Sequence, residues 1–146
     1  MPTGSCLCGE VKIAYTGEPV FTAICYCDDD RKEKMSNAQT FQIPQDNFKV
    51  TAGQPKTWEK VSDHGHDITT HFCSTCGTAL YRTGGATQVQ GMIGLRAGVL
   101  DDQTLLNDNP PKIEVYVERR PKWIAPVPEA TQLDSKYQIV THGAAG

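Results

Sequence analysis

Alternating hydrophobic and polar residues recur in short stretches along the chain and predict β-strands. Successive side chains of a strand point to opposite faces, so this alternation is typical of a strand with one buried face. Clusters of Gly, Pro, Asn and Asp separate the stretches and favour turns. We expect strands at residues 11–15, 20–24, 48–51, 57–61, 68–72, 79–82, 88–94 and 113–117, the first two forming a hairpin.

One stretch, residues 28–37, favours a short helix instead. Its acidic residues come first and its basic residues follow, which is the order that a helix dipole prefers. The sequence shows no internal repeat and no heptad pattern. We therefore predict an all-β fold class, mainly β with one or two short helices, arranged as two packed sheets.

The end of the chain has a different character. Pro126 and Pro128 interrupt regular structure, and the residues after them look loosely held. The sequence therefore predicts one domain at residues 1–128 and a C-terminal tail at 129–146.

Composition narrows the classes of function. The 146 residues make one domain, and 14 Lys and Arg against 17 Asp and Glu give a net charge of −3. This balance argues against nucleic-acid binding, which needs clustered basic residues. No apolar run approaches the roughly 18 residues of a membrane span, and the first residues do not resemble a secretory signal. We expect a cytoplasmic protein with reduced cysteines, no nucleic-acid partner and no membrane partner.

All six cysteines fall in close pairs. They are Cys6 and Cys8, Cys25 and Cys27, and Cys73 and Cys76, and glycines follow the first and the last pair. A pair this close is badly placed to form a disulfide within itself, whereas two thiolates on one turn can converge on a metal. Metal binding is the favoured interpretation, and disulfides between pairs or inert buried thiols are the alternatives.

The three pairs and their surroundings resemble a known family. Residues 4–11, 25–32 and 72–80 carry the resemblance, and residues 97–102, 110–113 and 119–123 extend it. The chain thus resembles the glutathione-dependent formaldehyde-activating enzymes and centromere protein V. The resemblance implies a two-sheet β-tent fold with zinc as cofactor, one structural ion and one catalytic ion.

The resemblance also assigns the ligands. It implies that Cys6, Cys8, Cys73 and Cys76 form a closed structural zinc site that joins the N-terminal strands to the central sheet. In the family a C-H-C-x-x-C-R-K segment supplies three thiolates to the second zinc. Here Tyr26 takes the place of the histidine, and Asp30 takes that of the third cysteine.

Asp30 leaves two interpretations open. A carboxylate also binds zinc, so Cys25, Cys27 and Asp30 form a chemically reasonable second site. A hard oxygen ligand in place of a soft sulfur would leave the metal more electron-poor. Alternatively that site is degraded, and Asp30 is only part of the acidic start of a helix.

Other side chains are candidates for roles at this site. The resemblance suggests Tyr26 or a nearby histidine for moving a proton, and Arg31 with Lys32 for binding the carboxylates of a peptide-like thiol. His64, His66 and His71 are each more typical of a surface turn or strand than of a ligand. Trp58, Trp123, Phe72 and Tyr81 are expected in the core or in a pocket wall.

Two functions from different classes follow. The first is a zinc-dependent carbon-sulfur lyase or synthase, with Tyr26 and Arg31 as catalytic residues, that acts on a small-molecule thiol or thiol adduct. Glutathione or a more specialised small molecule would be the substrate. The second is a catalytically inactive, zinc-stabilised scaffold that binds a protein partner. The sequence also allows a homo-oligomer.

Overall fold

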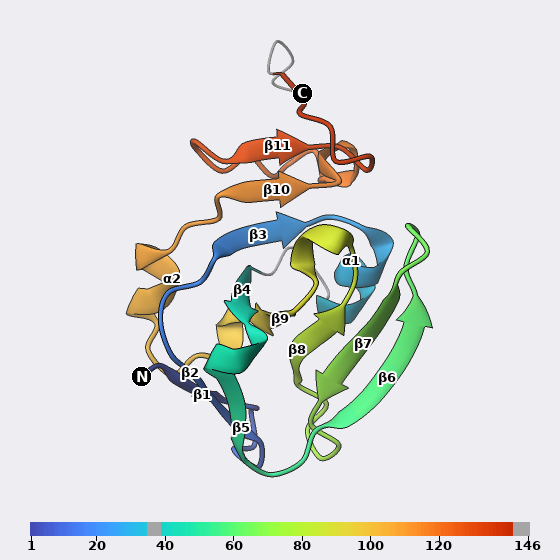
Figure 1. Cartoon of the computed structure of the whole chain (residues 1–146). Coiled ribbons are helices and arrows are strands. Elements are labelled where there is room, and N and C mark those ends of the chain that lie inside the picture. Colours follow the sequence, from blue (N-terminus) through green and yellow to red (C-terminus); the bar gives the residue numbers. More distant parts are fainter. Residues whose placement is uncertain (35–38, 142–146) are drawn as a thin grey trace.

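The computed structural model describes residues 1–34 and 39–141 and shows a mainly β protein with two sheets (Figure 1). The predicted fold class is therefore confirmed. In the described residues there are two short α-helices, α1 (Asp28–Lys34) and α2 (Thr104–Asp108). Single 3-10 turns are η1 (Gln45–Asn47), η2 (Thr87–Val89), η3 (Ala97–Val99) and η4 (Val117–Arg119).

The smaller sheet is antiparallel and has the strand order β1-β2-β5. Its strands are β1 (Thr3–Ser5), β2 (Lys12–Tyr15) and β5 (Phe48–Ala52).

The larger sheet has the order β11-β10-β3-β4-β9-β8-β7-β6. Strand β10 runs parallel to both β3 and β11, and the other neighbours are antiparallel. Its strands are β3 (Phe21–Cys25), β4 (Thr40–Pro44), β6 (Lys56–Val61), β7 (Asp67–Phe72), β8 (Ala79–Gly84), β9 (Met92–Arg96), β10 (Ile113–Val115) and β11 (Thr131–Leu133).

The predicted hairpin between residues 11–15 and 20–24 is wrong. Strand β2 belongs to the small sheet and β3 to the large one, and both pair with the β4-β5 segment instead. The amide of Thr16 donates to Asn47 O at 2.9 Å, and that of Val20 donates to Gln42 O at 2.8 Å. The chain thus crosses between sheets at the turn after β2 and returns at η1, so the two crossings lie side by side.

Residues after 128 are partly built into the large sheet. Strand β11 pairs with β10, and Gln132 is buried there, where its side chain donates to Glu114 at 2.5 Å. The expectation of a loosely held tail therefore does not hold for 131–133. Residues 142–146, like residues 35–37 of the predicted helix, lie outside the described part of the chain.

The main core lies where the two sheets face each other. Ile13 and Tyr15 of β2 pack in one buried cluster with Phe41, Leu80 and Leu95 of the large sheet. The prediction that Tyr81 is buried is confirmed, but Trp58 is 61% exposed and Trp123 is 82% exposed. Trp58 lies on β6, an edge strand of the large sheet, and among the described residues only β7 pairs with this strand.

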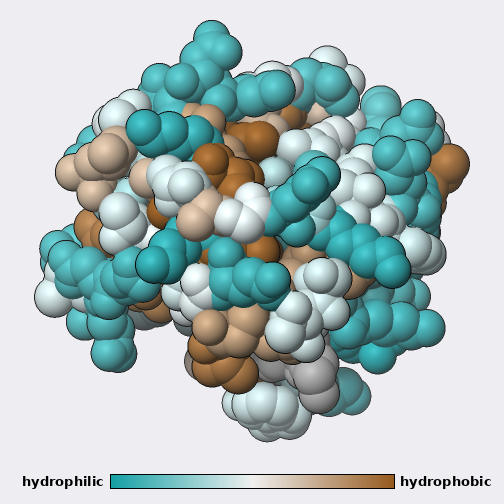
Figure 2. Space-filling view, turned by 90° about the horizontal axis from the view of Figure 1, so that it is seen from below, coloured by the Kyte–Doolittle hydropathy of each residue, from teal (hydrophilic) through white to brown (hydrophobic). Residues whose placement is uncertain are grey.

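The surface adds one further observation. On the face shown in Figure 2, hydrophilic side chains surround small groups of hydrophobic ones. The described residues contain no helix with the length and hydropathy of a membrane span.

Candidate metal centres and their pocket

The first cysteine cluster joins the two sheets. Cys6 and Cys8 lie in the turn between β1 and β2, and Cys73 and Cys76 lie in the turn between β7 and β8. The four sulfurs lie within 4.8 Å of one another. A glycine amide closes each turn: that of Gly9 donates to Cys6 O and that of Gly77 donates to Cys73 O, and both glycines have positive φ.

The spacing of these sulfurs fits zinc. Four thiolates at about 2.3 Å from a tetrahedral ion lie about 3.8 Å apart. The sulfurs of Cys6 and Cys8 are 3.6 Å apart, and those of Cys8 and Cys73 are 3.7 Å apart. Hydrogen bonds with Thr78 lower the pKa of Cys76 to about 5, so this sulfur is prepared to act as a thiolate ligand.

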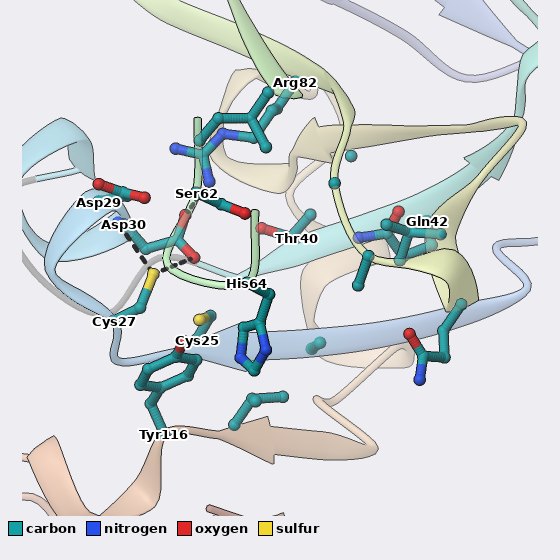
Figure 3. A pocket seen from close by; sticks show the side chains of 18 of the residues that line it. Cys25, Cys27, Asp29, Asp30, Thr40, Gln42, Ser62, His64, Arg82 and Tyr116 are labelled. Carbon is teal, nitrogen blue, oxygen red and sulfur yellow. Dashed lines mark hydrogen bonds and ion pairs between the residues drawn. The ribbon is translucent and has the colours of Figure 1, made fainter. Parts of the chain in front are cut away.

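The second cluster comes from one short segment. Cys25 ends β3, Cys27 follows two residues later, and Asp30 lies in the first turn of α1. Their ligand atoms also lie within 4.8 Å of one another. Figure 3 shows the three side chains directed toward one another, and we call them the metal triad.

The metal triad also fits a zinc ion. Tetrahedral zinc with ordinary bond lengths sets a sulfur and a carboxylate oxygen about 3.6 Å apart, and Cys27 Sγ lies 3.4 Å from Asp30 Oδ2. A hydrogen bond with Cys27, burial and the charge of Asp30 raise the pKa of the Cys25 thiol well above its ordinary value. A bound cation would reverse this effect, because it favours the deprotonated ligands.

Two arginines hold Asp30 from the other side. Asp30 is only 5% exposed, and its Oδ1 lies 3.2 Å from Arg82 Nη1 and 3.6 Å from Arg96 Nη2. The carboxylate thus directs one oxygen to the guanidinium groups of β8 and β9 and the other to Cys27. Side chains that form hydrogen bonds or ion pairs with a metal ligand, as these guanidinium groups do with Asp30, fix the orientation of that ligand toward the metal.

Glu33 completes this ion-pair network. It lies one turn after Asp30 on α1 and forms ion pairs with both Arg82 and Arg96, and it accepts a hydrogen bond from Thr70 at 2.7 Å. Burial alone would raise the pKa of Glu33, but the two arginines and Thr70 lower it below its ordinary value. Glu33 therefore fastens the helix that carries Asp30 to the large sheet.

The metal triad opens into a pocket of about 370 Å³. Cys25, Cys27 and Asp30 all line it, and none of the four cysteines of the first cluster does. This volume lies within the range of small-molecule sites, roughly 300–1,000 Å³.

Aromatic residues border the pocket beside the metal triad. Tyr116, Tyr137 and His64 all line it, and the His64 ring stacks on Tyr137 with centroids 4.6 Å apart. Figure 3 shows the Tyr116 ring directed toward the two cysteines. Tyr116 has a φ of 59°, in the left-handed region that few non-glycine residues adopt. Burial raises the pKa of Tyr116, so its hydroxyl stays protonated.

The two residues predicted as catalytic are placed elsewhere. Tyr26 is buried, its hydroxyl donates to Glu114 at 2.8 Å, and it is not among the residues that line the pocket. Arg31 is exposed on α1, 3.5 Å from Asp28, and it does not line the pocket either. Their catalytic roles stay predictions that this geometry does not favour.

The three histidines differ. His64 is at the pocket, whereas the His71 ring stacks on Tyr81 and its Nε2 lies 3.0 Å from Thr83. His66 lies in the turn with His64 but does not line the pocket. None of them joins either group of ligand atoms in the described chain.

Sequence reasoning missed Arg82, Arg96, Glu33 and Tyr116. Arg82 ends a predicted strand, and a charged residue at that position is only a weak indication of a site residue. Arg96 and Glu33 gave none, because their importance depends on contacts across 49 and 63 residues of sequence.

Comparisons with known proteins agree with this picture. The chain belongs to the family of the glutathione-dependent formaldehyde-activating enzyme, whose model matches residues 1–119. It also resembles a crystal structure of a Rhodobacter sphaeroides protein, a structural genomics target, with a TM-score of 0.56 and 18% identity over 74% of this chain and 97% of that one. This second likeness shows a shared fold alone. No curated protein matches the sequence significantly.

Proposed function

We propose that this protein is a zinc-dependent enzyme that forms or breaks a bond between a thiol sulfur and an electrophilic carbon. Its family includes enzymes and suggests a glutathione-related function. One observation carries the proposal: three metal-ligand side chains converge in the wall of an open pocket. Three protein ligands leave one position of a tetrahedral zinc for substrate, which four cysteines do not.

The metal triad would hold the ion, and each ligand has a defined support. Cys25 lies at the end of strand β3, and the sulfur of Cys27 accepts a hydrogen bond from the Asp30 amide at 3.4 Å. Asp30 forms ion pairs with Arg82 and Arg96. Zinc bound there would favour the thiolate form of a substrate thiol and polarise a carbonyl group. Asp30 in place of a third thiolate makes such an ion more electron-poor.

The reaction we propose is the reversible addition of a thiol to an aldehyde. The sulfur-carbon bond forms, and the thiol proton ends on the former carbonyl oxygen, so no oxidant or reductant is needed. We assign to Tyr116 a hydrogen bond to that oxygen, and its protonated side chain at the pocket beside the metal triad supports this role.

A second candidate is the zinc-stabilised scaffold without catalysis. The ion pairs of Asp30 with Arg82 and Arg96 favour it, since a buried ion-pair network also gives Asp30 a purely structural role. In that case only the four-cysteine site would bind zinc.

Metal analysis of the purified protein separates the two candidates. We expect two zinc ions per chain in the wild type and one in Asp30→Ala, with Asp29→Ala as matched control. Asp29 is the preceding residue, lines the same pocket and pairs with Lys60, but it is outside the metal triad. One zinc in the wild type, or no loss in Asp30→Ala, would contradict the enzyme proposal.

A further inference from the structure

We infer that the pocket selects an uncharged thiol or thiol adduct with an apolar substituent, and that it disfavours glutathione. This inference rests on the proposed function and names its substrate class. It follows from the charges and the surface that the pocket presents around the metal triad.

In the part of the chain that the structure describes, the pocket presents no Lys or Arg whose charge is not already paired. Among the described lining residues the basic side chains, His64 aside, are Arg82 and Arg96. Both form ion pairs with Asp30 and Glu33, although the buried Arg82 Nε has no hydrogen-bond partner among these residues. Glutathione carries two carboxylates. Burying them here without a partner would cost much of the free energy of binding.

The remaining charges of the pocket act in the same direction. Asp29 and Asp63 also line it, and their ion pairs with Lys60 at 2.5 Å and with Arg119 at 3.9 Å leave both of these neighbouring cations already paired. Arg31 and Lys32, which the sequence suggested for carboxylate binding, are exposed and do not line the pocket.

Part of the wall beyond the metal triad is aliphatic. The side chains come from five elements and belong to Ala23, Ile68, Val89, Met92, Ile113 and Val115. Such a wall gains affinity with each methylene that it buries, by about fourfold per group. An alkyl or aryl substituent on the sulfur therefore fits this surface better than a charged tripeptide.

The pocket wall also carries the uncharged side-chain amide of Gln42, which lies outside the ion-pair network. Gln42 lines the pocket, and its buried Oε1 has no hydrogen-bond partner among the described residues. Figure 3 shows Gln42 across the pocket from Cys27 and Asp30. It can recognise a neutral hydroxyl or amide of a substrate but gives no ionic contact.

Titration calorimetry on the zinc-loaded protein tests the inference. The probes are ethanethiol, propane-1-thiol, butane-1-thiol and glutathione, with butan-1-ol as the control for sulfur. We expect affinity to rise by about fourfold per methylene, and glutathione to bind at least tenfold more weakly than butane-1-thiol. Tighter binding of glutathione, or no dependence on chain length, would overturn the inference.

The same titration in Cys25→Ser separates this inference from the proposed function. We expect thiol binding to fall to the level of butan-1-ol when the metal triad is broken. If the variant keeps the full thiol affinity and the same preference for alkyl groups, the pocket selectivity stands and the proposed function fails. If glutathione is preferred in the wild type and that binding needs Cys25, the proposed function stands and the inference fails.

A charge added to the pocket rim gives an independent test. Gln88 is exposed and lines the pocket, whereas the neighbouring Thr87 is exposed and does not line it. Gln88→Arg should improve glutathione binding several-fold, and Thr87→Arg should not. Equal gains for both variants would show a general charge effect and would overturn the placement of the substituent in this pocket.

Discussion

The two cysteine clusters use similar ligands in opposite ways. The first takes its four sulfurs from turns of two different sheets, and Cys8 and Cys73, which meet there, are 65 residues apart in sequence. The second takes all three donors from residues 25–30 and places them in a pocket wall. A closed site that joins distant segments contributes to folding, whereas an open site on one segment is free to serve chemistry.

The surroundings of the clusters differ in the same sense. The first is supported by backbone turns that the amides of Gly9 and Gly77 close, and Thr78 Oγ1 lies 3.2 Å from the sulfur of Cys76. The second is supported by charged side chains from β8, β9 and α1. We therefore expect damage to the first cluster to appear as lost folding and damage to the second as lost chemistry.

The largest effect is expected from breaking the first cluster. Cys76→Ser removes one of four zinc ligands, and structural zinc contributes about 10–16 kcal/mol of binding free energy, comparable to the whole stability of a domain. We expect Cys76→Ser to be largely unfolded at 37 °C and to show no cooperative thermal transition. Circular dichroism measures this.

Cys25→Ser is the matched control for that variant. It should keep a melting transition close to that of the wild type, because its cluster joins no separate sheets. Unfolding of Cys25→Ser together with a normal melt of Cys76→Ser would mean that the roles of the two clusters are reversed.

A smaller effect is expected from Glu33→Gln, a loss of roughly 3 kcal/mol in the free energy of unfolding. The reason is that Arg82 and Arg96 lose a buried counter-charge. The lowered pKa of Glu33 adds a pH dependence. A carboxyl of this kind stabilises the fold fully above its unfolded pKa of about 4.3, and the effect is lost as pH falls through the folded pKa.

Denaturant unfolding of the wild type and of Glu33→Gln at several pH values measures how the stabilisation by Glu33 depends on pH. The difference in unfolding free energy should be constant near neutral pH and shrink below about pH 4. A difference that stays constant down to pH 2 would contradict the assigned ion pairs.

The smallest effect is expected from Tyr116→Phe. Loss of one hydrogen bond to the reacting oxygen should lower kcat by about 10- to 100-fold with unchanged zinc content. Thiol-aldehyde exchange followed by NMR provides the rate.

Tyr26→Phe is the comparison variant. Its hydroxyl bonds the buried Glu114, so we expect lower stability and a nearly unchanged kcat. The opposite result, a low kcat for Tyr26→Phe alone, would return the catalytic role to Tyr26.

Much of the strand content was predictable, because alternation is a local property of the sequence. The predicted strands at 57–61, 68–72 and 79–82 correspond to β6, β7 and β8. Pairing was less predictable: β2 and β3 follow each other with a short turn but belong to different sheets. Strand β11 was missed because Thr131–Leu133 is held by β10 and by buried Gln132 rather than by its own pattern.

The sequence by itself indicated three cysteine pairs suited to metal binding, because the two thiols of each pair lie within four residues of each other. Spacing did not decide which pairs share an ion, and the resemblance to the family supplied that division. Only the tertiary structure decided what surrounds Asp30. Arg82, Arg96 and Glu33 lie far apart in sequence and meet because β8, β9 and α1 pack together. The apolar, cation-poor pocket likewise exists only through folding, since its wall is assembled from side chains of many strands.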